Sequence, residues 1–453
     1  MTALNHRALV VSLPTLTRAF ETSLTTIQWT LLAYDLTVIG LVLTLGGLGD
    51  LFGRKRIYVG GFLLFVVGSA LCGLSQSAGQ LIAFRIVQAV GGSMLIANGR
   101  AIVSMVFPAK ERGKALGLTS MAFHVGFLTG PTLGGFLIDT IGWRWNFYIN
   151  IPIGLLGAYL AWRILEEGRE ARVPVKVDLM GAILLLLAST ALLYAMNQLP
   201  HVGLYHPVVL SAAVLSVIGL FFFFRTEMKA ETPILSLKLF RSRLFSASLL
   251  SLFFITSTQS AINFLMPFYL QSIMGFTPSQ TGWIIIANSA VIVMVAPIAG
   301  GLSDRFGSRL LCTAGAALIV AGQFFLASLT LDSSLPGIIV PLALTGLGWA
   351  IFNAPNQSAI LSAAPQDKLG VASGMTVTMA RMGGAMGTAL AATLFTYGLT
   401  AAGLDHLAIE SPQAWSATPE IFVRTYSHTI HIVNFFALLS VFFSAVRGGN
   451  SPN

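Results

Sequence analysis

Stretches of consecutive apolar residues recur along the whole chain, and each is long enough, at about twenty residues, to cross about 30 Å of hydrocarbon as a helix. Only 9% of the residues are charged. No polar segment between the stretches is long enough to fold as a soluble domain of ordinary size. The chain is therefore expected to be an all-α membrane protein.

The apolar stretches predict fourteen membrane spans, of which the first, around residues 8–16, is incomplete. The thirteen complete spans are expected at residues 27–47, 57–75, 80–105, 114–138, 147–165, 179–198, 207–225, 244–271, 281–300, 310–330, 336–361, 370–398 and 429–446. Cys72 and Cys312 both fall within these spans, near opposite ends, so no disulfide is expected between them.

Lysine and arginine are distributed unevenly between the two sets of loops. Of the 26 basic residues, 19 lie in alternate loops, whereas the opposite set holds only Arg18, Arg144 and Arg424. This asymmetry follows the positive-inside rule, so we expect a multi-pass protein of the cytoplasmic (inner) membrane with a cytoplasmic C-terminus. Nucleic acid is not an expected partner. The basic segments are residues 54–56, 110–114, 163–176, 225–243, 305–309, 368 and 447.

One loop motif occurs twice, with its aspartates Asp50 and Asp304 lying 254 residues apart. The first copy is GGLGDLFGRK, starting at Gly46, and the second is GGLSDRFGSR, starting at Gly300. A constant offset over several spans predicts two copies of one helical unit, as in many secondary transporters. The same offset relates Trp29 to Trp283, Gly92 to Gly346 and Gly130 to Gly384, and Pro14 matches Pro267 at 253.

The repeat divides the chain into two pseudo-symmetric six-helix bundles, expected at residues 1–165 and 244–453. Residues 166–243 form a linker with two inserted transmembrane helices. We expect these helices to lie beside the transport core; the alternative is that they line the pathway. The second bundle starts near Leu244, so its counterpart is expected to start about ten residues before Met1. The start is then misassigned or the chain truncated, and Asn5–Arg7 would lie inside the membrane.

The duplicated loop is expected to act as a gate at the cytoplasmic ends of the helices. Its glycines permit a tight turn, and the aspartate can accept hydrogen bonds from a helix N-terminus of the other half. The alternative is that the basic residues only anchor the topology. The predicted gating residues are Asp50, Gly53, Arg54, Asp304, Arg305 and Gly307.

A second candidate gating element is a stripe of small residues four apart, at Gly126, Gly130 and Gly134. Small residues let another helix approach closely, and Pro131 within the stripe loosens the helix. With the matching Gly384 in the second copy, the stripe predicts an interface between moving halves. Ordinary small-residue packing is the alternative.

Asp35 is the only carboxylate well inside a predicted span, and Arg85 lies at a similar depth in another. Buried charges in membranes are rare and mark functional sites. We expect Asp35 to take up and release a proton, with Arg85 favouring its ionised form. A static salt bridge or a residue at the aqueous rim are the alternatives.

Polar side chains in other spans are candidates for lining a substrate cavity. Amides are also common contacts between helices, and a histidine is often a packing residue, so ordinary packing is the alternative. No metal-ligand spacing, nucleophile motif or phosphate loop is present in the sequence, so neither enzymatic activity nor a cofactor or metal is expected. The candidate residues for the substrate cavity are Tyr34, His124, Gln259, Asn263, Asn353, Asn356 and Arg381.

Several of these motifs resemble those of the major facilitator superfamily. They are the duplicated loop, Arg85-x-x-Gln88 followed by Gly91-Gly92, and the Gly130-Pro131 helix. The sequence WRWNFYINIPIG at Trp143–Gly154, together with the span count, resembles the fourteen-helix drug:proton antiporter subfamily. In two places the chain departs from this pattern. Asn5 stands where members usually carry an aspartate in the first helix, and Ala89 follows Gln88 where they favour glycine.

The resemblance implies proton-coupled export of small amphipathic or cationic compounds, with the proton gradient as the energy source. The halves would rock to expose a central cavity to each side in turn, and the cytoplasmic loops would latch one state. A monomer in the lipid bilayer, with a small molecule and protons as partners, is expected. The alternatives are a metabolite or lipid exporter, an uncoupled facilitator, and a transporter-like sensor that moves nothing.

Overall fold

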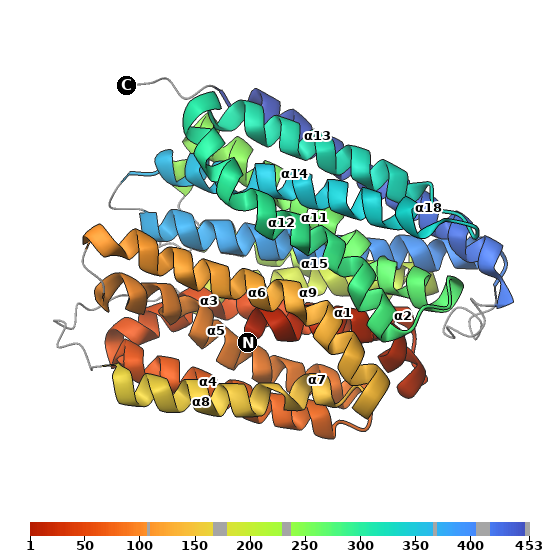
Figure 1. Ribbon diagram of the computed structural model, residues 1–453, viewed down its shortest axis with the longest axis horizontal. Helices are drawn as coiled ribbons and strands as arrows, with labels where there is room; N and C mark the ends of the chain where they lie inside the picture. The colour runs from red at the N-terminus through yellow and green to blue at the C-terminus, as the bar shows by residue number, and fades with distance from the viewer. Residues whose placement is uncertain (107–108, 166–178, 229–236, 366–368, 405–416, 449–453) are drawn as a thin grey trace.

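The computed structural model describes residues 1–106, 109–165, 179–228, 237–365, 369–404 and 417–448. These residues form helices and turns, and they contain no strand. The helices lie side by side, roughly along the longest axis of the molecule (Figure 1). This arrangement satisfies the backbone hydrogen bonds of each segment within the segment, as a lipid environment requires.

We refer to the long helices of the first repeat, with two short helical turns, as the N-terminal bundle. They are α1 (Thr2–Ala19), α2 (Leu24–Ile27), α3 (Trp29–Phe52), α4 (Arg54–Leu74), α5 (Ala78–Val106), α6 (Ala109–Ile141), α7 (Trp145–Tyr148) and α8 (Asn150–Ile164). Two further helices follow, α9 (Leu179–Val202) and α10 (Pro207–Glu227).

The helices of the second repeat form the C-terminal bundle, which occupies the upper part of Figure 1. They are the 3₁₀ turn η1 (Leu237–Arg241), α11 (Arg243–Phe268) with its π-helical continuation η2 (Tyr269–Ile273), α12 (Pro278–Phe306), α13 (Ser308–Ala327), α14 (Leu335–Ser362), α15 (Leu369–Ala401) and α18 (Pro419–Val446).

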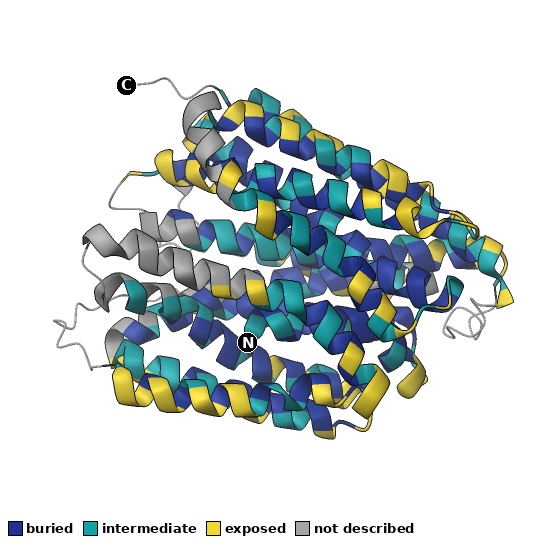
Figure 2. Ribbon diagram, in the orientation of Figure 1, coloured by how far each residue is buried: buried dark blue, intermediate teal, exposed yellow. Residues whose placement is uncertain are grey.

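Ten helical segments of the described residues are long and apolar enough to cross a membrane. Two more helices, α6 and α9, contribute shorter apolar stretches, Val125–Ile141 and Ile183–Met196. The structure thus confirms an all-helical polytopic membrane fold, with fewer qualifying spans than the fourteen expected. The spans differ in environment. In the apolar stretch at Leu24–Val42, 83% of the residues are buried, whereas in that of α10 only 17% are. Exposed residues follow the outward faces of α8 and α13 (Figure 2), where lipid would lie.

Equivalent helices of the two bundles pack through equivalent residues. Gly92 of α5 lies against Tyr34 of α3, so closely that a Cβ atom would come 2.4 Å from the tyrosine oxygen. Gly346 of α14 lies against Asn288 of α12, where a Cβ atom would come 2.3 Å from the backbone oxygen. Both members of the second pair lie 254 residues beyond those of the first, so the offset seen in the sequence is also an offset of contacts.

The helices α9 and α10 lie beside the bundles, along the junction of α3 and α15. Leu186 of α9 packs against Gly40 of α3, and Thr393 of α15 donates a hydrogen bond of 2.8 Å to the backbone oxygen of Met196. On its other side, α9 packs against α10 where Gly219 meets Ala188. The α9 helix therefore contacts both bundles, whereas α10 mainly faces outward.

Candidate functional site

An ion pair connects the two bundles at the junction of α3 and α15. Nη1 of Arg381 donates to Oδ1 of Asp35 at 2.5 Å, and Asp35 is only 8% exposed. Nε2 of His6, on α1, lies 3.5 Å from the other carboxylate oxygen. Three helices from the two bundles thus meet around one buried carboxylate, whose negative charge is balanced by a guanidinium of the opposite bundle.

Arg85 does not take part in this ion pair, contrary to the expectation from its depth. The side chain is fully buried, its Nε donates to the backbone oxygen of Thr30 at 2.9 Å, and its Nη1 donates to Oδ1 of Asn5 at 2.6 Å and Oε1 of Gln88 at 2.5 Å. All three acceptors are uncharged. Arg85 is therefore not an ion-pair partner of Asp35, because the rotation of α5 turns the guanidinium toward α1 and the amide of Asn5. Its role in proton coupling stays a prediction.

The Arg85 guanidinium also lies over the ring of Tyr34, at 4.3 Å from its centroid. A cation over an aromatic face is attracted by the ring quadrupole. Tyr34, predicted as a cavity residue, is thus fully buried beneath Arg85, next along the chain to Asp35.

A second guanidinium lies at the junction of α6 and α12. Arg7 of α1 is 3% exposed, its Cζ lies 3.9 Å from the ring centroid of Phe127, and its Nη2 donates to Oγ of Ser289 at 3.5 Å. His6 and Arg7 are not among the predicted site residues. Their position as polar residues at the start of an apolar helix was the available signal, but it does not identify their neighbours.

The remaining predicted cavity residues are dispersed. Asn356 is fully buried and donates to the backbone oxygen of Ser248 at 3.2 Å, so it joins α14 to α11. Asn353 accepts from Gln357 on the same helix at 3.3 Å. Gln259 and Asn263 of α11 are half-buried. Of the predicted set, the structure brings Tyr34 and Arg381 to Asp35, and it places Asn356 in a contact between helices of one bundle. The side chain of His124 lies outside the described residues.

The duplicated loops form the tight turns expected from their glycines. Gly53 and Gly307 have φ angles of 96° and 74°, which glycine adopts without steric cost. They separate α3 from α4 and α12 from α13. Arg54 begins α4 and is half-buried. The side chains of Asp50, Asp304 and Arg305 lie outside the described residues.

The small-residue stripe of α6 faces α1 of the same bundle. A Cβ atom at Gly130 would come 2.7 Å from Cβ of Arg7, and the equivalent Gly384 of α15 faces Ser260 of α11. The glycines four apart thus pack within their own bundle, and the expected contact with the other half is made by the neighbouring face of α6, which carries Pro131 and Gly135. There the backbone of Pro131 lies against Gly282 of α12.

The bundles also meet at the predicted outer end, at the right in Figure 1. The backbone nitrogen of Ser279 donates to Oδ2 of Asp139 at 2.8 Å, and Nε2 of Gln271 donates to the backbone oxygen of Val11 at 3.0 Å. These contacts join α12 to α6 and η2 to α1.

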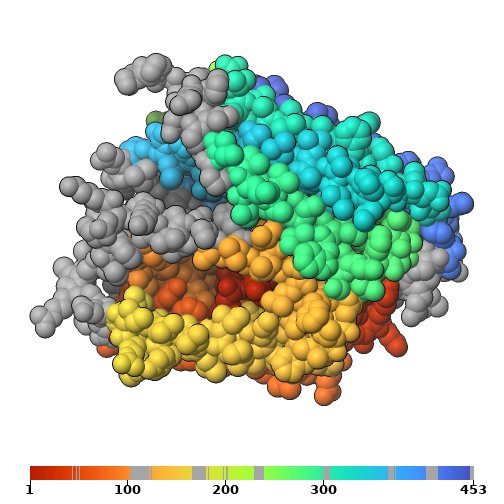
Figure 3. Space-filling model, in the orientation of Figure 1, coloured from red at the N-terminus to blue at the C-terminus, as the bar shows by residue number. Residues whose placement is uncertain are grey.

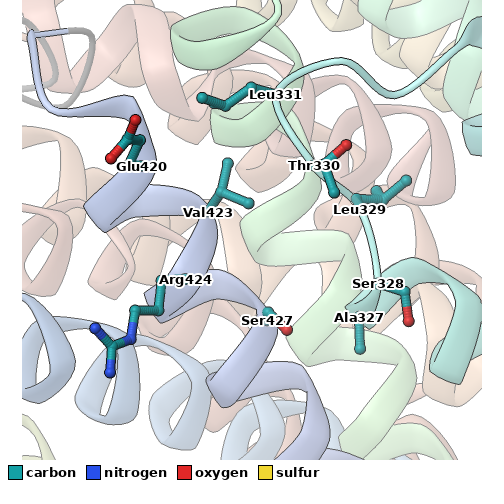
Figure 4. Close-up of a pocket in the computed structure, with 9 residues that line it drawn as sticks. All are labelled: Ala327, Ser328, Leu329, Thr330, Leu331, Glu420, Val423, Arg424 and Ser427. Atoms are coloured by element: carbon teal, nitrogen blue, oxygen red, sulfur yellow. The ribbon is translucent and has the colours of Figure 1, made fainter.

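A surface depression of about 380 Å³ lies at the same end. Residues of the α13–α14 connection and of α18 line it, including Glu420 and Arg424 (Figure 4). All of its lining residues belong to the C-terminal bundle, and none is a predicted site residue. The depression is therefore separate from the junction around Asp35.

Comparison with known proteins agrees with this architecture. The model of the Major Facilitator Superfamily matches residues 1–388. The chain belongs to this superfamily. It is 34% identical over 400 residues to the riboflavin transporter RibZ of Clostridioides difficile, covering 88% of this chain and 86% of that protein. It is 31% identical over 425 residues to the multidrug resistance protein Stp of Mycobacterium tuberculosis, covering 93% and 79%.

The fold of this superfamily member matches solved structures as well. A bacterial homologue of the human lysosomal transporter Spinster, in an inward-facing and unoccupied conformation, superposes with a TM-score of 0.71 at 17% identity, covering 98% of this chain and 94% of that one. The major facilitator protein described here is thus a multi-pass membrane transporter of small molecules.

Proposed function

We propose that this transporter exports small amphipathic compounds in exchange for protons by alternating access. The observation that carries the proposal is the buried Asp35–Arg381 ion pair between the bundles. A carboxylate is able to bind a proton, and this one holds together two elements that would separate when the bundles rock. The relative named as a multidrug resistance protein supports an export function.

In this mechanism, the proton controls the contact between α3 and α15. While Asp35 is ionised, its attraction for Arg381 favours the conformation in which the junction is closed. A proton that enters from outside neutralises Asp35 and removes this attraction, so the bundles separate there. Arg381 would then be left without a counter-charge, and burying one unpaired charge in a bilayer costs about 2.5–3.5 kcal/mol on the insertion scale. This cost favours the separated state. Release of the proton to the cytoplasm restores the ion pair.

The proposal includes the features that the drug:proton antiporter subfamily implies. The protein would have fourteen spans in the inner membrane, with the basic loops and the C-terminus in the cytoplasm, and would act as a monomer without a cofactor. The loops at Gly53 and Gly307 would latch one conformation. Pro131 would loosen α6, where it contacts both α1 and α12.

A second candidate function is export of riboflavin or a similar planar metabolite. The relative that is 34% identical bears the name of a riboflavin transporter. The junction offers amide, hydroxyl and guanidinium groups beside aromatic rings, at Asn5, Tyr34 and Arg85. Such groups suit a planar molecule with several carbonyl acceptors.

A transport assay with three fluorescent probes tests both functions. Cells that express the protein are loaded with riboflavin, ethidium or fluorescein, and efflux is measured with and without a proton uncoupler. Efflux that the uncoupler abolishes supports the exchange mechanism, and riboflavin as the preferred probe supports the second candidate. Efflux that resists the uncoupler indicates a facilitator. Absence of efflux for all three probes would contradict transport of this class and favour a sensor.

A further inference from the structure

We propose that Arg7 binds the anionic group of the transported compound, so that this transporter prefers organic anions with an aromatic body to cations. This inference rests on the proposed transport function and assigns its substrate class. It concerns the junction of α6 and α12, which is distinct from the Asp35–Arg381 contact.

The first observation is that the Arg7 charge is buried without a counter-charge. No carboxylate lies within ion-pair distance of it in the part of the chain that the structure describes. Its Nε has no hydrogen-bond acceptor among these residues, and its bond to Ser289 is long, at 3.5 Å. An isolated buried charge is costly, and a bound anion that accepts its free donors would lower this cost.

The second observation is that another buried guanidinium of the N-terminal bundle, that of Arg85, has the same deficiency. The acceptors of Arg85 are uncharged, and its Nη2 has no partner among the described residues. Among the described residues at these junctions, Arg381 is balanced by Asp35, whereas Arg7 and Arg85 have no carboxylate partner. A cationic substrate in this region would be repelled, whereas an anion would be attracted, and the low dielectric of the interior strengthens both effects.

The third observation is the position of the aromatic rings. Phe127 covers one side of the Arg7 guanidinium and Tyr34 covers one side of that of Arg85. At Arg7, a ring stacked on the flat face of the guanidinium leaves N–H edges available, and such edges bind a carboxylate or phosphate with two parallel hydrogen bonds. The rings add apolar area for the body of the ligand. The geometry therefore fits an aromatic anion.

Binding of three matched probes to the purified full chain in nanodiscs tests the inference. The probes are 2-naphthoate, 2-naphthamide and 2-naphthyltrimethylammonium, which share a ring system and differ in charge. We expect the wild-type protein to bind the naphthoate at least tenfold more tightly than the ammonium compound. Equal affinity, or a preference for the ammonium compound, would overturn the proposal.

Two variants locate the effect at Arg7. Arg7→Gln should weaken naphthoate binding at least tenfold and leave naphthamide binding unchanged. Ser289→Asp should do the same while retaining the guanidinium, because the new carboxylate would lie next to Nη2 of Arg7 and neutralise it. Ser289→Asn is the matched control and should retain naphthoate binding. The Ser289 variants keep the test valid if Arg7→Gln does not fold. An equal loss for all three probes would show a structural role and contradict the proposal.

The source of the anion is distinguished by the lipid. In nanodiscs of phosphatidylcholine alone, Arg7-dependent binding of naphthoate supports a transported anion. Stabilisation of the wild-type protein by phosphatidylglycerol, without any effect of naphthoate, would assign Arg7 to a lipid headgroup and overturn the substrate assignment. Failure of this inference is separable from failure of the proposed function, since proton-coupled efflux of ethidium or riboflavin would then persist. Loss of all uncoupler-sensitive efflux would contradict the proposed function instead.

Discussion

The two junctions between the bundles occupy equivalent places in the repeat but carry different chemistry. At the first, Asp35 of α3 binds Arg381 of α15. The positions 254 residues away are Ser289 of α12 and Phe127 of α6, and Arg7 of α1 lies between these two side chains. One junction is thus closed by a charge pair, and the other contains a charge without its pair. The duplicated backbone provides two equivalent positions, and sequence divergence has given them different charges.

This difference separates coupling from recognition in the proposed mechanism. A proton can break the first junction because it neutralises one member of an ion pair. The second junction contains no carboxylate next to Arg7 among the described residues, so a proton cannot act there in the same way. The unpaired guanidinium of Arg7 is instead able to bind an anionic ligand. In the space-filling view, the molecule is hollowed between α6 and α8, and part of the red N-terminal segment is visible inside (Figure 3). A route toward the N-terminal helix from this face is consistent with such a binding role.

Asp35→Asn should have the largest effect, because it removes the titrating group and leaves the half-buried Arg381 without a counter-charge. Breaking a buried ion pair costs about 3–5 kcal/mol, so proton-driven transport in proteoliposomes should fall more than a hundredfold. Substrate-driven proton movement, followed with a pH-sensitive dye, is the measurement. Glu420→Gln, an exposed acid outside the junction, is the control and should behave as wild type. Normal proton movement in a folded Asp35→Asn protein would exclude this residue as the coupling site.

Asn5→Asp should give the guanidinium of Arg85 a counter-charge, like the one that Asp35 provides for Arg381 at the first junction. The new carboxylate would accept from Nη1 of Arg85, where the amide oxygen now lies at 2.6 Å. A hydrogen bond to a charged group contributes about 1.5–3 kcal/mol, so the thermal midpoint in detergent should rise. Asn5→Gln, which keeps an amide, should not raise it. A lower midpoint for Asn5→Asp than for wild type would indicate that Arg85 does not require a counter-charge.

Gly92→Ala and Gly346→Ala test whether the framework around the two junctions is equivalent. At each position a Cβ atom would overlap a neighbour, the Tyr34 oxygen or the Asn288 backbone. Overpacking of this kind costs about 1–3 kcal/mol, and both variants should lower the thermal midpoint by similar amounts. Gly79→Ala is the control, since a Cβ atom there meets nothing within 4 Å. A clear effect at only one of the two glycines would show that the bundles are less alike than their contacts suggest.

His6→Gln should have the smallest effect. The distance from Nε2 to the Asp35 carboxylate is 3.5 Å, and such a loosely held ion pair contributes about 0.2–1 kcal/mol. When protonated, His6 adds to the attraction on Asp35 and opposes the nearby charges of Arg381 and Arg85, while Tyr34 lies beside it. Transport at saturating substrate should change by less than about sixfold. An effect as large as that of Asp35→Asn would transfer the coupling role to His6.

Much of the fold could be predicted because membrane helices are defined by local properties. Apolar length predicts a span, as at Arg54–Leu74 and Ser308–Ala327, which both qualify. Two glycines in repeated loops predict the turns at Gly53 and Gly307. A lone carboxylate in an apolar segment predicts a site, and Asp35 does lie at the contact between the bundles; its role in coupling stays a prediction. None of these predictions requires knowing which helix lies next to which.

The partners of these residues depend on tertiary packing. Arg381 lies 346 residues from Asp35, and the rotation of α3 and α15 about their axes is what brings their side chains together. The same kind of rotation turns Arg85 toward Asn5 and directs the stripe at Gly130 to α1. Hydropathy is a property of each segment and is visible residue by residue along the chain. Helix rotation arises from the packing of all neighbouring side chains at once, so the three-dimensional arrangement assigns the charges of this transporter to their partners.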